Sequence, residues 1–416
     1  MFMKIKDICH INLSSITSND EIENILYLDT SNLCENVIGC LQPFMLSEAP
    51  SRAQRKVKHK TILYSMVRPN QKHFGIMDNP SDNLIASTGF VTIDVKNEEK
   101  ENYDAHFLYY ILSQNWVTSY LQTIAENSVS SYPSINPSDI GNLNFTFPKI
   151  EVQRQIAAVL KNIDNKIALN RAINQNLEKM AKQLYDYWFV QFDFPNEEGK
   201  PYKSSGGKMV WNEKLKREIP IGWFASNICR IADILSGGTP SKTVPQYWEN
   251  GDIPFFGPTD CNGNCFQIET ADHITKDGLA HCSSSLFEEG TVIITARGSI
   301  GKLVIVGTPM AMNQSCYALR SKTKEFEYLF FLTIQLIEYL KAKGNGSVFK
   351  SIIASDIENS LLCIADNNTI TEFCNVVRPL FKKIKENTLE YLGLTKQRDE
   401  LLPLLMNGQV SPQNCD

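Results

Sequence analysis

Two groups of residues have types and spacings that could support phosphate or metal chemistry. The segment Ala296–Leu303 resembles a phosphate-binding loop, but Ala296 replaces the first glycine of that motif and Leu303 replaces its serine or threonine. Asp94 with Glu98 and Lys100 has the residue types of a nuclease metal site, but these residues belong to a polar, loop-like run. We therefore predict neither nucleotide binding nor nuclease chemistry at these positions.

A zinc site is a third possibility. Cys261 and Cys265 are spaced as a ligand pair, and His273, His281 and Cys282 follow downstream. No second closely spaced pair completes the set, although structural zinc sites usually have one. Structural roles are therefore the favoured interpretation of these side chains.

Other catalytic signatures are absent from the sequence. An adenine or cytosine amino-methyltransferase would carry Asn or Asp followed by Pro-Pro and an aromatic residue, and the chain has no Pro-Pro dipeptide. It also has no Gly-x-Ser-x-Gly elbow, and its 6 histidines are few for acid-base or metal chemistry. We therefore expect a protein that is not itself an enzyme.

The composition describes a folded, soluble protein. The chain has 416 residues, enough for two or three domains, with 43% hydrophobic and 21% charged residues. It contains no signal peptide and no run of about eighteen apolar residues that could cross a membrane. Its 11 cysteines are scattered and odd in number, which favours reduced thiols and a cytoplasmic location.

The two halves of the chain carry an internal repeat. At an offset of 217 residues, Ser134-Ile135 aligns with Ser351-Ile352. Ser138-Asp139-Ile140 aligns with Ser355-Asp356-Ile357 at the same offset, and further matches continue downstream. Because chance does not readily give so many matches at one offset, the chain is predicted to contain two units of the same kind.

Each repeat leads into a heptad pattern, in which seam residues recur at steps of four and three, as in coiled-coil helices. One seam alone would suit an ordinary core helix, but two seams favour mutual pairing. We expect Pro379 to bend the second helix or delay its start. The first seam contains Ile156, Leu160, Ile163, Ile167, Asn170, Asn174, Leu177, Ala181, Leu184 and Trp188. The second contains Phe373, Val377, Leu380, Ile384, Asn387, Tyr391, Leu394, Arg398, Leu401 and Leu405.

The sequence before each helix predicts a globular domain. β-rich runs at 60–67 and 290–296 are broken by turn residues, and shorter helices are predicted at 105–122 and 325–343. The predicted fold class is mixed α/β (α+β), with two globular domains and two long helices that pair as a coiled coil. The predicted divisions are domain 1–150, helix 151–190, connecting segment 191–219, domain 220–367 and helix 368–408.

This arrangement resembles the specificity subunit of type I restriction-modification systems over nearly the whole chain. Local phrases of such subunits also recur, and they are specific when taken together and in order. In the first half these are Val67-Arg68-Pro69-Asn70 and Ala86-Ser87-Thr88-Gly89-Phe90. In the second half they are Ile219–Trp223, Ser236–Ser241, Tyr247-Trp248, Gly251–Pro254, Gly290–Ile294, Gly298–Gly301 and Asn313-Gln314. Because Gly-Thr-Pro-Ser has no counterpart in the first unit, that unit is expected to approach DNA differently.

The resemblance implies two target recognition domains, each reading part of a bipartite double-stranded DNA target, held apart by an antiparallel coiled coil. It implies no catalysis and no cofactor in this chain. Two methyltransferase subunits would bring S-adenosylmethionine, and restriction/translocase subunits would use ATP and Mg. The net charge of −5 argues against binding by bulk electrostatics, so partners are expected to contribute phosphate contacts.

Candidate DNA contacts are polar or basic residues of the basic run 51–60, of the phrases above and of the loops 127–134 and 345–351. A surface or turn role is an equally simple explanation of each residue taken singly. In the first unit they are Arg52, Arg55, Lys56, Lys58, Lys60, Arg68, Asn70, Tyr132 and Ser134. In the second unit they are Thr239, Ser241, Lys242, Arg297, Ser299, Lys302, Lys350 and Ser351.

Antiparallel pairing about the seam centres predicts that Asn174 faces Asn387 and that Asn170 lies near Tyr391. Two alternative functions stay open. One is a coiled-coil interaction scaffold without DNA binding, which competition binding on DNA with the methyltransferase partner present would reveal. The other is a self-contained DNA-modifying enzyme, which methylation or cleavage of DNA by the purified chain alone would reveal.

Overall fold

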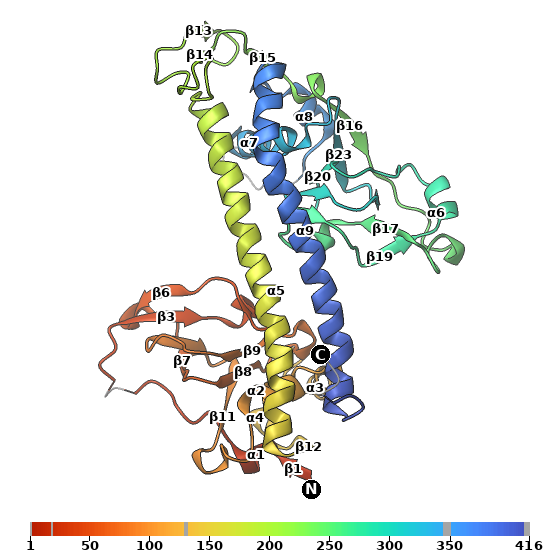
Figure 1. Cartoon of the computed structure of the whole chain (residues 1–416). Coiled ribbons are helices and arrows are strands. Elements are labelled where there is room, and N and C mark those ends of the chain that lie inside the picture. The colour runs from red at the N-terminus through yellow and green to blue at the C-terminus, as the bar shows by residue number, and fades with distance from the viewer. Residues whose placement is uncertain (1, 18–19, 129–131, 344–350, 412–416) are drawn as a thin grey trace. The chain divides into compact units, whose positions relative to one another are not determined.

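The structure is a computed structural model that describes residues 2–17, 20–128, 132–343 and 351–411. It divides into two compact units. The first unit comprises Met1–Lys166 and Leu394–Asp416, and the second unit comprises Ile167–Gly393. Both units contain sheets and helices, which confirms the mixed α/β fold class (Figure 1). The boundaries between the two units fall within the two long helices rather than at their ends. Each of these helices contributes side chains to the cores of both units.

The first unit is built on two four-stranded sheets. The sheet orders are β2-β11-β8-β9 and β6-β3-β10-β7, and β3 pairs parallel with β10. The predicted strand at 60–67 is β8 (Thr61–Ser65), which is buried at every residue and lies in the middle of its sheet. The remaining strands are β2 (Cys9–Ile11), β3 (Asn24–Leu28), β6 (Gln42–Met45), β7 (Ala53–Lys56), β9 (Phe74–Met77), β10 (Leu84–Ser87) and β11 (Phe90–Val95).

The helix predicted at 105–122 is two helices, α2 (Ala105–Leu112) and α3 (Asn115–Glu126). The chain breaks at Gln114, whose backbone is extended and whose side-chain amide donates to the Ile111 carbonyl. The Trp116 indole N–H donates in turn to the Gln114 side-chain oxygen, which stabilises the new helix start. These side-chain contacts compete with the helical backbone pattern and end α2 early.

The second unit repeats this topology. Its larger sheet has the order β16-β23-β20-β21-β18, and its smaller sheet has the order β19-β17-β22, with β17 parallel to β22. The first four strands of the larger sheet correspond in order to β2, β11, β8 and β9 of the first unit. Their bounds are β16 (Ala232–Ser236), β17 (Ile253–Phe256), β18 (Phe266–Gln267), β19 (Asp272–Ile274), β20 (Val292–Thr295), β21 (Leu303–Val306), β22 (Ala311–Met312) and β23 (Cys316–Ser321).

Equivalent short elements close each unit. β1 (Phe2–Lys4) pairs antiparallel with β12 (Asn144–Thr146), and β15 (Phe224–Ser226) pairs antiparallel with β24 (Leu362–Ile364). The repeated Ser-Asp-Ile segments lie in α4 (Pro137–Gly141) and α8 (Ala354–Asn359). In both helices the aspartate accepts the backbone N–H three residues earlier, at 2.7 Å for Asp139 and 3.0 Å for Asp356. The repeat seen in the sequence is therefore a helix-start motif, in which the carboxylate satisfies an amide outside the helix.

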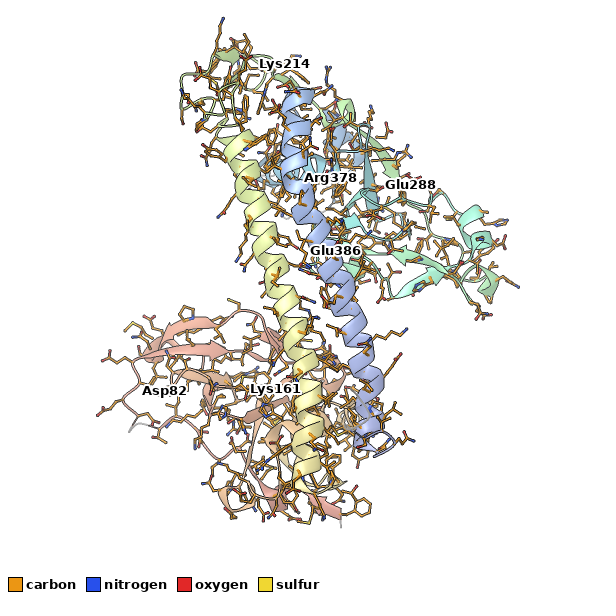
Figure 2. All side chains as sticks on the ribbon, viewed as in Figure 1. Asp82, Lys161, Lys214, Glu288, Arg378 and Glu386 are labelled. Carbon is orange, nitrogen blue, oxygen red and sulfur yellow. The ribbon has the colours of Figure 1, made fainter. Side chains whose placement is uncertain are left out.

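The two heptad segments form the long helices α5 (Ile150–Tyr185) and α9 (Asn367–Met406), and α5 continues into a π-helical turn at Asp186–Val190. Pro379 lies inside α9, so the predicted delay of the helix start, one of the two effects expected of this residue, does not occur. In the second unit α9, which carries Arg378 (Figure 2), packs against α7 (Phe326–Lys343), and the Arg378 guanidinium donates to Glu327 at 3.0 Å. Tertiary contacts of this kind hold the helix through the proline.

Inside the second unit the two helices pair antiparallel in the predicted register. Asn387 Nδ2 donates to Asn174 Oδ1 at 2.9 Å, and both side chains are buried. Asn174 Nδ2 donates to the Ile384 carbonyl and to the Thr388 hydroxyl, each at 3.1 Å. Asn170 donates to Glu390, the residue before Tyr391, at 3.0 Å. The buried amides are therefore hydrogen-bonded, and they oppose shifts of register.

Inside the first unit the ends of the same helices share a core. Leu402 and Leu405 of α9 are buried with Ile156 and Leu160 of α5. Arg398 Nη1 donates to Asp164 Oδ1 at 3.0 Å, and the Tyr110 hydroxyl donates to Asp164 Oδ2 at 2.7 Å. The carboxyl end of α9 therefore completes the amino-terminal unit.

The connecting segment between α5 and the second sheet is turn-rich, as expected, but its aromatic residues are packed. Phe194 stacks on Tyr202 and on Trp223, with ring centroids 4.6 Å and 5.1 Å apart. A hairpin of β13 (Met209–Asn212) and β14 (Arg217–Pro220) follows. In the described part of the chain, no helix is both long and apolar enough to span a membrane.

Candidate nucleic-acid interface

At one end of the β2-β11-β8-β9 sheet of the first unit, three segments distant in sequence meet. The Met66 N–H, just after β8, donates to the Gly89 carbonyl at 2.9 Å, just before β11. The Ile135 N–H, after α3, donates to the Met66 carbonyl at 2.9 Å. We call this arrangement of Met66, Gly89 and Ile135 the first junction.

The second unit contains the same junction. The Ala296 N–H, just after β20, donates to the Ser315 carbonyl at 2.8 Å, just before β23. The Ile352 N–H donates to the Ala296 carbonyl at 3.0 Å. We call Ala296, Ser315 and Ile352 the second junction. The repeated sheets therefore end in the same hydrogen-bonded arrangement.

Side chains next to the junctions lie at equivalent positions, and two of the three positions differ in chemistry. Beside the first junction are Val67, Thr88 and Ser134, which we call the first row. Beside the second junction are Arg297, Gln314 and Ser351, which we call the second row. Val67 is exposed, as are Arg297 and Gln314. One backbone arrangement thus presents two different sets of side chains to solvent.

Several predicted contacts of the first unit gather near the first row. The Arg68 guanidinium lies 5.7 Å from the centre of the Tyr132 ring, and the Arg68 N–H donates to the Pro133 carbonyl. The Asn70 N–H donates to the Gln122 side chain at 3.1 Å. Arg52 reaches the same end of the sheet, because its carbonyl accepts the Thr88 N–H at 2.7 Å. Arg52 and Arg68 are both exposed and add positive charge there.

Predicted contacts of the second unit gather near the second row. The Thr239 hydroxyl donates to Gln314 Oε1, and Ser299 lies in the turn that follows Arg297. Lys302 Nζ donates to the Cys261 carbonyl at 3.3 Å. Ser241 and Lys242 continue from Thr239, and the Lys242 ammonium lies 5.5 Å from the centre of the Trp248 ring. Lys350 lies outside the described residues.

The basic run 51–60 does not form one patch, contrary to the simplest interpretation of the sequence. Arg52 lies before β7, whereas Lys58 and Lys60 lie at the start of β8, at the opposite end of that strand from the first junction. Lys56 forms an ion pair with Asp20. Arg55 is half-buried and contacts the Ser15 hydroxyl at 3.4 Å, and burial lowers the pKa of its guanidinium. Because the run turns through a strand, its charges are distributed around the unit.

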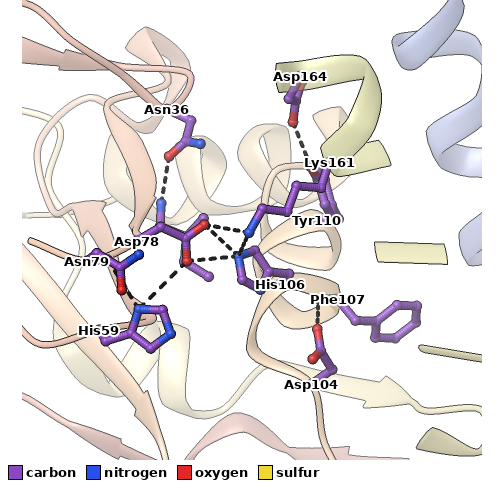
Figure 3. Close-up of polar contacts among 11 residues, drawn as sticks. Asn36, His59, Asp78, Asn79, Asp104, His106, Phe107, Tyr110, Lys161 and Asp164 are labelled. Atoms are coloured by element: carbon purple, nitrogen blue, oxygen red, sulfur yellow. Dashed lines mark hydrogen bonds and ion pairs between the residues drawn. The ribbon is translucent and has the colours of Figure 1, made fainter. Parts of the chain in front are cut away.

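Lys58 and Lys60 flank a separate group of charges around Asp78. Its carboxylate accepts from Lys161 at 2.7 Å and lies 3.0 Å from His106 Nε2, while His59 is 4.0 Å away (Figure 3). Although partial burial acts to raise it, hydrogen bonds from Lys161 and His106 leave the pKa of Asp78 below its ordinary value. This group connects the strand end to α5, which carries Lys161.

The motifs that could have indicated catalysis have structural roles. The segment Ala296–Leu303 is the turn between β20 and β21, so no helix begins where a phosphate-binding loop needs one. Burial raises the pKa of the Cys261 and Cys265 thiols, which disfavours the thiolate form that zinc binds. Within the described ranges, no group of three or more His, Cys, Asp or Glu side chains is placed to hold a metal ion.

Comparison with known proteins identifies the family. A family model described as "Type I restriction modification DNA specificity domain" matches residues 1–179 and 220–364, so each matched segment contains one row. The chain belongs to this type I DNA specificity family. The family had been predicted from the order of the units and their local phrases, and this prediction is confirmed.

Individual relatives of this family match along most of their length. The chain is 30% identical over 380 residues to the type I restriction enzyme MjaIX specificity subunit of Methanocaldococcus jannaschii, covering 86% of this chain and 83% of the relative. It is 25% identical over 439 residues to the HindI specificity subunit of Haemophilus influenzae, covering 93% and 94%. The crystal structure of the type I restriction-modification S subunit from M. genitalium has a TM-score of 0.56 at 15% identity, covering 97% of this chain and 95% of that one, and supports the fold.

Sequence reasoning did not single out Val67, Thr88 or Gln314 as contacts. All three lie within phrases that carry the resemblance to this type I DNA specificity family, and that was the available signal. Their positions beside the junctions depend on strand pairing between distant segments, which the phrases alone do not reveal.

Proposed function

We propose that this chain is the DNA-recognition subunit of a type I restriction-modification complex, with the first row facing one half of a bipartite target and the second row facing the other. The observation that carries the proposal is the duplicated junction with different side chains beside it. The duplicated junction presents each row from the same local backbone arrangement, while different polar and apolar side chains give the two units different base preferences.

Phosphate contacts in this proposal come from the exposed cations next to the rows. Arg52 and Arg68 serve the first unit, and Lys242, Arg297 and Lys302 serve the second. Lys58 and Lys60 lie away from the first row, and Lys56 is neutralised by Asp20, so these residues are weaker candidates. Since the whole chain carries a net charge of −5, partner subunits would supply further cations.

The partners in this proposal are methyltransferase subunits, expected to be two, and restriction subunits. In this proposal a partner docks on the paired helices of the second unit, which carry single exposed apolar side chains. They are Leu169 and Met180 on α5 and Val376 and Leu389 on α9. S-adenosylmethionine, ATP and Mg would be bound by those partners rather than by this chain. A cytoplasmic location is part of this proposal and is supported by the odd number and scattered positions of the 11 cysteines in the sequence.

Genome-wide methylation mapping tests this function. A host strain that carries the chain should show methylation at one bipartite sequence, and a strain without the chain should lack it. Competition binding of the purified complex should favour DNA with that sequence over DNA altered in either half. Loss of preference in both assays would favour a scaffold, and methylation or cleavage by the chain alone would favour a self-contained enzyme.

A further inference from the structure

The Gln314 side chain is restrained by the segment Gly237–Thr239, which follows β16, the strand that pairs with β23. A Cβ atom at Gly237 would lie 2.1 Å from the Asn313 carbonyl oxygen, and one at Gly238 would lie 2.1 Å from the Ser283 hydroxyl oxygen. Only glycine permits so close an approach. The two glycines therefore bring Thr239 against Gln314, where its hydroxyl donates to Gln314 Oε1.

The backbone on both sides of Gln314 is fixed as well. The Asn313 N–H donates to the Phe256 carbonyl at 2.9 Å, and the Asn313 side-chain oxygen accepts the Ser315 N–H at 2.9 Å. Gln314 is nevertheless exposed. An exposed side chain with a fixed backbone and a bonded amide is preorganised for a ligand, because little rotamer entropy remains to be lost on binding.

The bond from Thr239 restrains the orientation of the Gln314 amide. Because Gln314 Oε1 accepts from the hydroxyl, Nε2 is distinguished from it and remains a donor, while Oε1 keeps a second lone pair. A neighbouring donor and acceptor of this kind match N7 and the N6 amino group of adenine in the major groove. Guanine presents two acceptors at that edge and does not match.

The equivalent position of the first unit has a different chemistry. Thr88 replaces Gln314 beside the first junction, and its backbone N–H is bound by the Arg52 carbonyl at 2.7 Å. Arg52 belongs to the turn before β7, whereas Thr239 follows β16. The residue that contacts Thr88 is therefore not the counterpart of the residue that contacts Gln314. Two readers with the same backbone thus differ at this point, as two different half-sites require.

We propose that Gln314 determines specificity in the second half-site by reading one adenine in the major groove, and that Thr239 is the positioning residue that orients its amide. This inference rests on the proposed function, since it requires that the second row faces DNA.

The test uses the full chain in complex with its methyltransferase partner and DNA in which each base pair of the mapped target is varied singly. Gln314→Ala should reduce discrimination at one A·T pair of the second half-site by about 5- to 150-fold, the range for a bidentate base contact. Gln314→Glu keeps the shape and the bond from Thr239 but loses the Nε2 donor, so it should lose the same preference. Preferences in the first half-site should not change.

Variants of Thr239 separate orientation from folding. Thr239→Val should weaken discrimination at that same base pair. Thr239→Ser, which keeps the hydroxyl, should retain the discrimination of the unaltered chain. Thr323→Val, near the opposite end of β23, is the matched control and should have no effect on base preference. Unchanged discrimination in Gln314→Glu, or a loss at a G·C pair or in both half-sites, would overturn the assignment. If the unaltered complex shows no sequence preference, the proposed function itself fails.

Discussion

At the residue scale, two groups of charged residues in the first unit differ in their surroundings. Arg52 and Arg68 are exposed beside the first row, whereas the cations around Asp78 are bound by its carboxylate. The Asp78 group lies at the other end of β8 and connects a strand end to α5. We therefore assign it to stability and not to DNA binding.

Asp78→Asn should lower stability at neutral pH by about 0.5–1 kcal/mol, the range of partly exposed ion pairs. The pKa of Asp78 is depressed in the folded state, so its contribution is fully present above the unfolded value near 3.8 and is lost as the pH falls through the folded pKa. The difference between variant and parent should therefore decrease as the pH falls below 3.8. Urea unfolding at pH 7 and at pH 3 measures this, with the exposed Asp82→Asn as control; an equal difference at both pH values would contradict it.

At the element scale, the two long helices combine an apolar seam with a short buried polar segment. Asn174, Asn387 and Thr388 bond to one another in the middle of this seam. Buried amides lower the stability available from a fully apolar seam, but a shifted register would leave them without partners. A lower stability with a fixed register is consistent with the proposed function, in which the helices set the spacing of two recognition domains.

Asn174→Ala should destabilise the second unit by about 1–3 kcal/mol, because it leaves the buried Asn387 amide without its acceptor. Replacing both asparagines by leucine should restore much of this loss, since no unpaired amide remains. Hydrogen exchange of residues 370–390 reports the local opening free energy. The exposed Asn176→Ala is the matched control, and a single variant as stable as the parent would show that the amides do not couple the helices.

Helix length should set the unread gap in the DNA target. Inserting four residues near Leu177, with a matching insertion near Asn387, lengthens the pair by about 6 Å, which corresponds to about one to two base pairs. Four residues are also a tolerated interruption of the heptad pattern. Methylation mapping should find both half-sites unchanged with a longer gap. The original gap at full activity would show that the helices do not measure the spacing.

At the scale of the whole molecule, the compact units do not coincide with continuous segments of chain. The first unit is completed by residues from 394 onward, which add Arg398, Leu402 and Leu405 to its core. The amino-terminal reader therefore depends on the carboxyl end of the chain for its stability.

A chain ending at Gly393 should lose stability in the first unit selectively. Burial of two leucine side chains alone contributes about 3–6 kcal/mol, which is a large part of the stability of a typical domain. Hydrogen exchange should show lost protection in residues 1–166 and retained protection in the sheets of the second unit. A chain ending at Ser411 is the control, and equal protection of residues 1–166 in both truncated chains would contradict this dependence.

The two readers should act independently, because each row belongs to its own unit. Ser351→Ala should weaken binding by about 2- to 10-fold, the value of one hydrogen bond, and only when the second half-site is intact. Ser134→Ala is its equivalent in the first unit and should affect only the first half-site. Lys350, which we also expect to contact DNA, lies outside the described residues. Equal loss in both half-sites for either variant would contradict independence.

The long helices, their register and the duplication could be predicted from the sequence. Heptad spacing is local and repeats many times, so the seams around Asn174 and Asn387 could be recognised without a structure. The same holds for β8 and β20, whose runs of residues that favour strands are short and bounded by turn residues. Ordered phrases then indicated the family. Pro379 and the break at Gln114 were exceptions, because tertiary packing held one helix together and side-chain bonds ended another.

The grouping of side chains at the candidate interface could not be predicted from the sequence and follows from the tertiary structure. Val67, Thr88 and Ser134 come from three segments, and their proximity follows from hydrogen bonds between Met66, Gly89 and Ile135. Strand order and register depend on pairing between distant segments. A run such as 51–60 can therefore look like one basic patch, although Arg52 lies near the first junction and Lys60 lies at the opposite end of β8. Local spacing encodes periodic elements, whereas the site depends on pairings that the chain makes only when it folds.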